Sequence, residues 1–169
     1  MEQRSLIAYD EYFKSAQKFD YFVTGISGAL FAYIAQTYQP REIRFSPDTL
    51  EPVALLFLAL AFFFGMKRIE AGVTSSGSNF ISLDAGEKAG NMTEALGRST
   101  PGYNPYSGGL IHPEQISAQR EKHMHQAKAS LKQTKVFAGK ADKYYSYRNL
   151  FLYGGFAAIL LSKILQPYS

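Results

Sequence analysis

Three stretches of the sequence are rich in apolar residues and carry almost no charge. The first, 21–40, has no charged residue over 20 positions; the second, 49–66, contains PVALLFLALAFFFGM, and the third, 149–166, contains LFLYGGFAAILLS. As a helix rising about 1.5 Å per residue, the first stretch reaches about 30 Å, the thickness of a bilayer core. Lys163 costs about 3 kcal/mol only at the bilayer centre and can snorkel from the end of the third stretch. We therefore predict three transmembrane helices; the alternative is a soluble protein with unusually apolar core helices.

Helical periodicity continues outside these stretches. Before the first, residues 1–20 carry an apolar stripe at three- and four-residue spacing, which predicts an amphipathic helix running into the membrane. This stripe consists of Leu6, Tyr9, Phe13 and Ala16. After the second, residues 67–112 begin with a similar seam, which indicates a helix extension. That seam consists of Ile69, Val73, Ser76, Phe80 and Leu83.

A Gly/Pro-rich segment, GRSTPGYNPYSGGLIHP, follows and predicts a loop. From Pro113 to Arg148 no proline interrupts the chain, which predicts a long basic helix over 113–148, continuous with the third span. The expected fold class is an all-α integral membrane protein, with three transmembrane helices continuous with a helical stalk on the cytoplasmic side.

The distribution of charge predicts the orientation. The segment from Lys67 to Arg148 carries 12 Lys plus Arg against seven acids, whereas residues 41–51 carry two against three. Cations close to membrane spans favour the inner side. We expect the N-terminus and residues 67–148 on the cytoplasmic side and the C-terminus outside. Four cations at the ends of the spans are expected to contact lipid head groups: Lys67, Arg68, Arg148 and Lys163.

Small side chains predict where helices pack. The first span has a small face made of Gly25, Gly28, Ala32 and Ala35. Such faces let membrane helices approach closely, within one subunit or between subunits. On the basic helix, a second seam has the same role: Met124, Ala127, Leu131, Thr134, Ala138, Ala141 and Tyr145. Thr24 and Gln36 are the polar positions of the first span that could line a pore.

Composition excludes several chemistries. There is no Cys, which excludes disulfides, thiolate metal sites and a cysteine nucleophile. No phosphate-binding loop, His-Glu-x-x-His or nucleophile elbow is present. His123 and His125 are two apart on the expected helix, so they point about 200° from each other and cannot share a metal. The basic helix lacks aromatic residues along most of its length, so nucleic acid is not an expected partner. We expect no metal or cofactor.

One short motif suggests a catalytic alternative. The segment Arg120-Glu121-Lys122-His123-Met124-His125 resembles the Arg-x4-His signature of the HEPN ribonuclease family over six of the 169 residues. That resemblance implies that Arg120 binds phosphate and His125 transfers protons, across a helical dimer. The apolar C-terminal stretch departs from the soluble domain of that family.

The sequence thus leads to a non-enzymatic membrane protein that acts as an oligomer or as an accessory, structural subunit of a membrane complex. Its expected partners are the lipid bilayer and other membrane subunits, identical or different. A homo-oligomeric pore-forming channel is the alternative, and a membrane-anchored ribonuclease is a more distant one.

Overall fold

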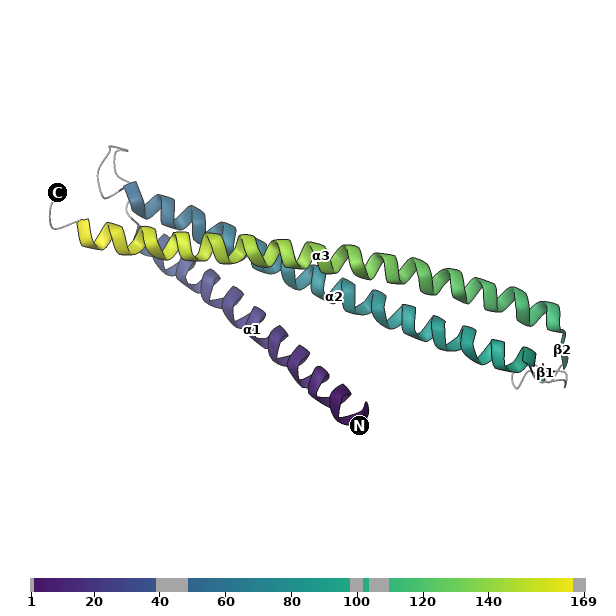
Figure 1. Cartoon of the computed structure of the whole chain (residues 1–169). Coiled ribbons are helices and arrows are strands. Elements are labelled where there is room, and N and C mark those ends of the chain that lie inside the picture. The colour runs from purple at the N-terminus through teal and green to yellow at the C-terminus, as the bar shows by residue number, and fades with distance from the viewer. Residues whose placement is uncertain (1, 39–48, 98–101, 104–109, 166–169) are drawn as a thin grey trace. The chain divides into compact units, whose positions relative to one another are not determined.

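The computed structural model describes residues 2–38, 49–97, 102–103 and 110–165. Within them are three helices: α1 (Glu2–Thr37), α2 (Leu50–Gly97) and α3 (Pro113–Leu165) (Figure 1). Two strands of two residues, β1 (Gly102–Tyr103) and β2 (Leu110–Ile111), pair antiparallel with Gly102 opposite Ile111. The described fold is therefore helical, as predicted, and the short ladder lies in the segment expected to form a loop.

The helices run without a break through the junctions between the apolar stretches and the segments beside them. α1 joins the amphipathic segment to the first apolar stretch, and α3 runs unbroken through 53 residues. α2 stays helical through the poor helix formers of residues 74–78, because Ser78 is buried and the Ser75 hydroxyl donates to the Thr134 carbonyl at 3.2 Å. The predicted ends of two spans, at 39–40 and 166, and loop residues 98–101 and 104–109 lie outside the described residues.

The chain divides into two compact units. Unit 1 comprises Met1–Ala71 and Lys140–Ser169, so it contains α1, the start of α2 and the end of α3. Unit 2 comprises Gly72–Gly139, the remainder of α2 and α3 with the connection between them.

Most of the buried α2 side chains in unit 1 are small. On α2, Ala54, Leu58, Ala61 and Gly65 recur at spacings of four, three and four and are buried. A Cβ atom added at Gly65 would lie 2.5 Å from Thr24 Oγ1, and one added at Gly154 would lie 2.7 Å from the Phe57 ring. Because these glycines have no side chain, α1 and α3 both pack closely against α2, as helices do in membranes.

Aromatic rings strengthen the contact between α2 and α3 in unit 1. The Phe64 ring stacks on Phe151 with centroids 5.5 Å apart and planes 6° apart, and lies 5.3 Å from the Tyr147 ring. Phe57 meets the other side of this group, with its ring edge-on to Phe151 at 5.7 Å. Such pairs each add about 0.5–1.5 kcal/mol beyond the area they bury.

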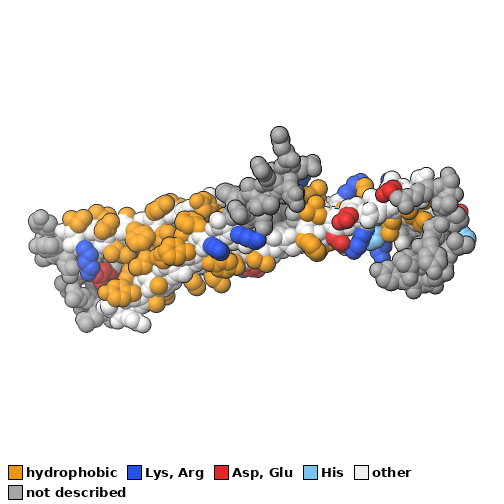
Figure 2. Space-filling model, turned by 90° about the horizontal axis from the view of Figure 1, so that it is seen from below, with side chains coloured by type: hydrophobic (Ala, Val, Ile, Leu, Met, Phe, Trp, Pro, Cys, Tyr) orange, Lys and Arg blue, Asp and Glu red, His pale blue; other side chains and the backbone are white. Residues whose placement is uncertain are grey.

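The outside of unit 1 is apolar, and part of its inside is polar. Phe22, Tyr33 and Leu160 are more than 60% exposed, whereas Thr24 and Ser27 are buried at 3% and 0% exposure. Hydrophobic side chains cover much of the face around the end of α3 in Figure 2. By length and composition, two of the described helices, α2 and α3, are long and apolar enough to cross a membrane. The first predicted span, in α1, is not among them.

In unit 2, α2 and α3 pack along a seven-residue repeat. The α2 seam consists of small residues at spacings of four and three: Ser75, Ser78, Ser82, Ala85 and Ala89. Ser75 and Ser82 each donate to an α3 carbonyl, of Thr134 at 3.2 Å and of Ala127 at 2.9 Å. Facing it, the inward residues of α3 have the same spacing: Ile116, Arg120, His123, Ala127, Ser130, Thr134 and Phe137.

This α3 seam differs by one position from the predicted one. Ala127 and Thr134 in unit 2 and Ala141 in unit 1 turn inward, whereas Met124, Leu131 and Ala138 are exposed. In unit 1, the Tyr145 side chain is 39% exposed, but its ring lies against Arg68 of α2. The small residues of α2 let the two backbones approach closely here, and two serine hydroxyls reach α3 carbonyls across the contact.

The close approach at Gly65 yields a prediction. Gly65→Ala should lower the free energy of unfolding by about 1–3 kcal/mol, because the methyl group would overlap Thr24. Gly72→Ala, also in α2, is the matched control, since a Cβ there meets nothing within 4 Å, and helix propensity should make it neutral or slightly stabilising. Thermal unfolding in detergent measures both. Equal midpoints for the two variants would contradict the packing described here.

Candidate functional site

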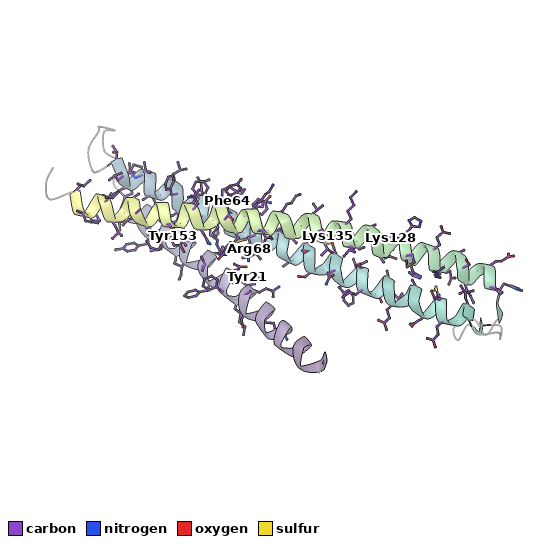
Figure 3. The ribbon with its side chains drawn as sticks, in the orientation of Figure 1. Tyr21, Phe64, Arg68, Lys128, Lys135 and Tyr153 are labelled. Carbon is purple, nitrogen blue, oxygen red and sulfur yellow. The ribbon has the colours of Figure 1, made fainter. Side chains whose placement is uncertain are left out.

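A buried carboxylate joins the three helices of unit 1. Asp20 of α1 accepts from Arg68 Nε of α2 at 2.7 Å through Oδ2 and from Arg148 Nη1 of α3 at 2.8 Å through Oδ1. Both oxygens of one side chain are therefore used, each by a different helix. Arg68 lies where the three helices meet (Figure 3) and also donates to the Ala141 carbonyl at 3.2 Å. We call Asp20, Arg68, Arg148 and Tyr145 the arginine cluster.

Tyr145 completes the arginine cluster. Its ring centroid lies 4.5 Å from the Arg68 guanidinium carbon and 4.9 Å from that of Arg148. These distances are within the range of cation–π attraction, which suits guanidinium groups that have lost part of their water. One carboxylate thus faces two cations, and the ring face takes part of the remaining positive charge.

Arg148 is the most deeply buried member of the arginine cluster. Its side chain is 0% exposed, and Nη2 has no hydrogen-bond partner among the described residues. This corrects the expectation that Arg148 contacts lipid head groups directly, because a side chain with no exposed surface cannot do so. Arg68 keeps 20% of its side chain exposed. The sequence showed Arg148 as a cation at the end of a span but gave no sign that Asp20, 128 positions earlier, would draw it inward.

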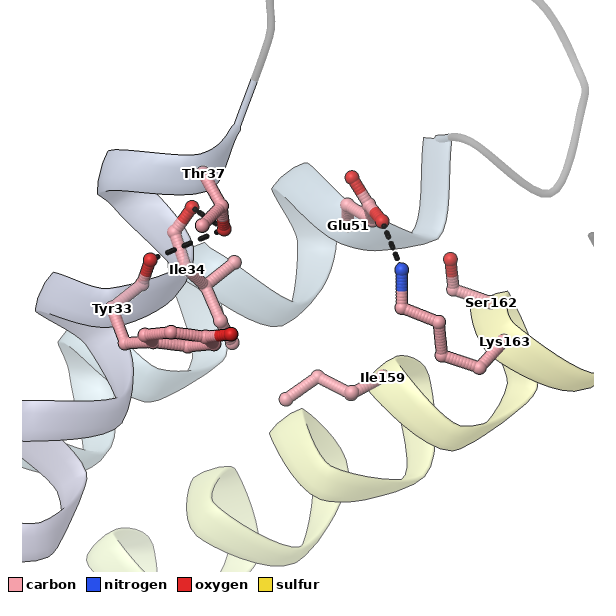
Figure 4. Close-up of a pocket in the computed structure, with 7 residues that line it drawn as sticks. All are labelled: Tyr33, Ile34, Thr37, Glu51, Ile159, Ser162 and Lys163. Carbon is pink, nitrogen blue, oxygen red and sulfur yellow. Dashed lines mark hydrogen bonds and ion pairs between the residues drawn. The ribbon is translucent and has the colours of Figure 1, made fainter.

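The other end of the unit 1 apolar zone carries a second ion pair. Lys163 Nζ of α3 lies 3.1 Å from Glu51 Oε1 at the start of α2. The pair borders a cavity of about 280 Å³, whose other lining residues come from the ends of α1 and α3 (Figure 4). These residues are Tyr33, Ile34, Thr37, Ile159 and Ser162. The Thr37 hydroxyl is bonded to carbonyls of its own helix, so its donor is not directed at the cavity.

The two charged layers bracket an uncharged zone. Glu51 and Arg68 are 17 residues apart on α2, and Arg148 and Lys163 are 15 apart on α3, or roughly 23–25 Å by helix rise. A bilayer core is about 30 Å thick, and long cationic side chains can extend beyond their own backbone position. The spacing therefore fits a membrane whose two surfaces lie near these layers.

Lys67, another cation expected to contact lipid head groups, has a side chain that is 42% exposed. Lys67 Nζ lies 2.7 Å from Glu70 Oε2. The hydrogen bond from this carboxylate, followed by its negative charge, raises the pKa of Lys67. Lys67 therefore stays protonated at neutral pH, next to the arginine cluster on the chain but without a bond to it in the contacts described above.

The small residues predicted on α1 divide into two groups. Gly28 packs against α2, since a Cβ atom added there would lie 3.0 Å from the Phe62 ring. Gly25, Ala32 and Ala35 are exposed, and a Cβ at Gly25 would meet nothing within 4 Å. Of the two possible pore positions, Thr24 is buried against α2 and Gln36 is exposed. They do not form a shared polar lining within one chain.

The residues of the ribonuclease-like motif are placed apart. Arg120 Nε donates to Thr93 Oγ1 at 2.8 Å, whereas the His125 side chain is 79% exposed and lies 3.9 Å from Glu121. Five residues of helix turn them about 140° from each other. Across the described part of the chain, no group of three His, Asp or Glu side chains is arranged to hold a metal ion.

Comparisons with protein-family models, with curated proteins and with solved structures give no match. The chemistry of the described residues therefore carries the functional argument.

The arginine cluster yields a second prediction. Asp20→Ala should destabilise the protein by about 3–5 kcal/mol, because it leaves two arginines without their shared counter-ion, one of them fully buried. Glu70→Ala removes an exposed carboxylate that also pairs with a cation and should leave the unfolding midpoint nearly unchanged. Unfolding in detergent, followed by circular dichroism, compares the two. Similar losses in both would contradict the central role of Asp20.

Proposed function

We propose that this chain is an integral membrane protein whose three helices all cross the bilayer and which acts, without catalysis, as a structural subunit of an oligomeric membrane complex. The observation that carries the first part is the inverted polarity of α1. Asp20, Thr24 and Ser27 lie on one buried stripe, while Phe22, Ile26 and Tyr33 face outward. Water would favour the opposite arrangement, because large exposed apolar surfaces are costly for a soluble monomer.

The same observation explains how α1 can span although its composition is less apolar than that of α2 and α3. Its polar groups do not meet lipid: the Ser27 hydroxyl donates to the Val23 carbonyl at 2.8 Å, and Asp20 is paired. A spanning helix needs an apolar surface only where lipid touches it, and the polar side chains of this stripe face the other helices of unit 1 instead.

Exposed apolar and small side chains support the role as a subunit. In unit 1, Gly25, Ala32 and Ala35 of α1 are exposed although small faces favour helix packing. In unit 2, outside the apolar stretches, Phe80 is 71% and Leu83 65% exposed on α2. Side chains of this size on a surface beyond the lipid favour burial against a further protein chain.

The topology can be tested with single cysteines, because the chain has none of its own. If α1 crosses the membrane, a membrane-impermeant maleimide added to intact cells should label Thr37→Cys and should label Ser15→Cys and Lys128→Cys only after permeabilisation. If only α2 and α3 cross, Ser15→Cys should be labelled from outside together with Thr37→Cys. That second pattern would contradict the three-span proposal while leaving the protein in the membrane.

The role as a subunit predicts an effect of enlarging the small face. Ala32→Leu should shift the oligomer distribution in native mass spectrometry after gentle detergent extraction, because the larger side chain would hold an opposing helix away. Ala157→Leu on α3 makes the same change at another exposed position and is the control. A wild-type protein extracted as a bare monomer, or one that conducts ions in liposomes, would contradict the structural-subunit proposal.

A further inference from the structure

We propose that the arginine cluster binds the phosphate of an anionic phospholipid at the inner surface of the membrane. This inference rests on the proposed function, since it requires unit 1 to sit in a bilayer. It adds to that function a specific ligand class and the residues that recognise it.

The arginine cluster carries an excess of positive charge. Both oxygens of Asp20 are occupied, by Arg68 at 2.7 Å and by Arg148 at 2.8 Å. One negative charge therefore meets two positive charges, and arginine keeps its proton under all physiological conditions. An uncompensated cation beside an apolar zone is costly, so an additional anion would stabilise the cluster.

The two arginines of the cluster contribute to ligand binding in different ways. Arg148 Nη2 is buried and has no hydrogen-bond partner among the described residues. Because Arg148 has no exposed surface, it acts on a ligand through its charge. Arg68 donates through Nε to Asp20 and through Nη1 to the Ala141 carbonyl, yet 20% of its side chain stays exposed, so it is the group that can touch the ligand and form a charge-assisted hydrogen bond to a phosphate oxygen.

The arginine cluster lies at the level where the proposed membrane places lipid phosphates. Asp20, Arg68 and Arg148 each lie directly at the inner end of an apolar stretch, where lipid phosphates are found. Tyr21, Tyr145 and Tyr147 are 55%, 39% and 47% exposed near the same level, and Tyr is enriched where the acyl region meets the head groups. A lipid phosphate reaches this level with its acyl chains against the exposed apolar side chains, whereas a free phosphate ion lacks that second attachment.

The excess positive charge also selects the type of lipid. A zwitterionic lipid would bring its own cation toward Arg68 and Arg148, but an anionic lipid such as phosphatidylglycerol would not. We expect native mass spectrometry in detergent to show about tenfold tighter binding of phosphatidylglycerol than of phosphatidylcholine with the same acyl chains.

Two neighbouring positions give a matched pair of variants. Arg68→Gln leaves the neutral Asp20–Arg148 pair in place and should weaken phosphatidylglycerol binding about tenfold. Lys67→Gln removes the same charge one residue away, but Glu70 already balances that charge, so binding should weaken clearly less than in Arg68→Gln. Arg68→Lys keeps the charge and should restore most of the preference, which separates loss of charge from loss of fold. Unfolding midpoints of all three variants verify that they are folded.

Three results would overturn the inference. They are equal binding of the two lipids, equal losses in Arg68→Gln and Lys67→Gln, and displacement of phosphatidylglycerol by millimolar inorganic phosphate, which would identify a free-anion site. Each can occur in a protein that remains membrane-integral, so it would leave the proposed function standing. Recovery of the protein in the soluble fraction would instead remove the proposed function itself.

Discussion

The structure of unit 1 depends on one carboxylate shared by two arginines from different helices. Asp20 is the one acidic group that the arginine cluster contains, and through it α1 is bonded to both α2 and α3. A charge this close to an apolar zone is tolerated only when it is paired, and the paired groups lie at one end of each apolar stretch. The small residues on α2 and the polar stripe of α1 follow from that arrangement, because they let the helices approach until the ions are in reach.

The distribution of polar and apolar side chains in unit 1 is the reverse of that in a water-soluble bundle. In a water-soluble bundle, hydrophobic burial would drive assembly and polar residues would face outward. In unit 1 many exposed side chains are large and apolar, whereas the contacts between helices combine glycine, alanine and serine with stacked aromatic rings and ion pairs. Close packing and hydrogen bonds then hold the helices together, as is typical where lipid removes the advantage of burying apolar groups.

The helices could be predicted from the sequence, but their partners could not. Apolar runs and the absence of proline after Pro113 located α2 and α3, because these signals are local. The inward residues of α3 in unit 2 were predicted at Met124 and Leu131, whereas the structure uses His123 and Ser130. Hydropathy favours the apolar positions, and no pattern within α3 reveals that serine hydroxyls of α2 bond to the carbonyls of Ala127 and Thr134. The pairing of Asp20 with Arg148 was missed for the same reason, since it joins residues 128 positions apart.

The hydroxyl-to-carbonyl bonds of unit 2 also limit how the length of this chain can change during evolution. Ser75 and Ser82 are seven residues apart, and so are their acceptors, Thr134 and Ala127. Deleting a single residue between the two donors would rotate one serine away from its acceptor by about 100°. Removing seven residues from each helix together would restore the alignment, so related chains should differ in length here by paired heptads rather than by isolated gaps.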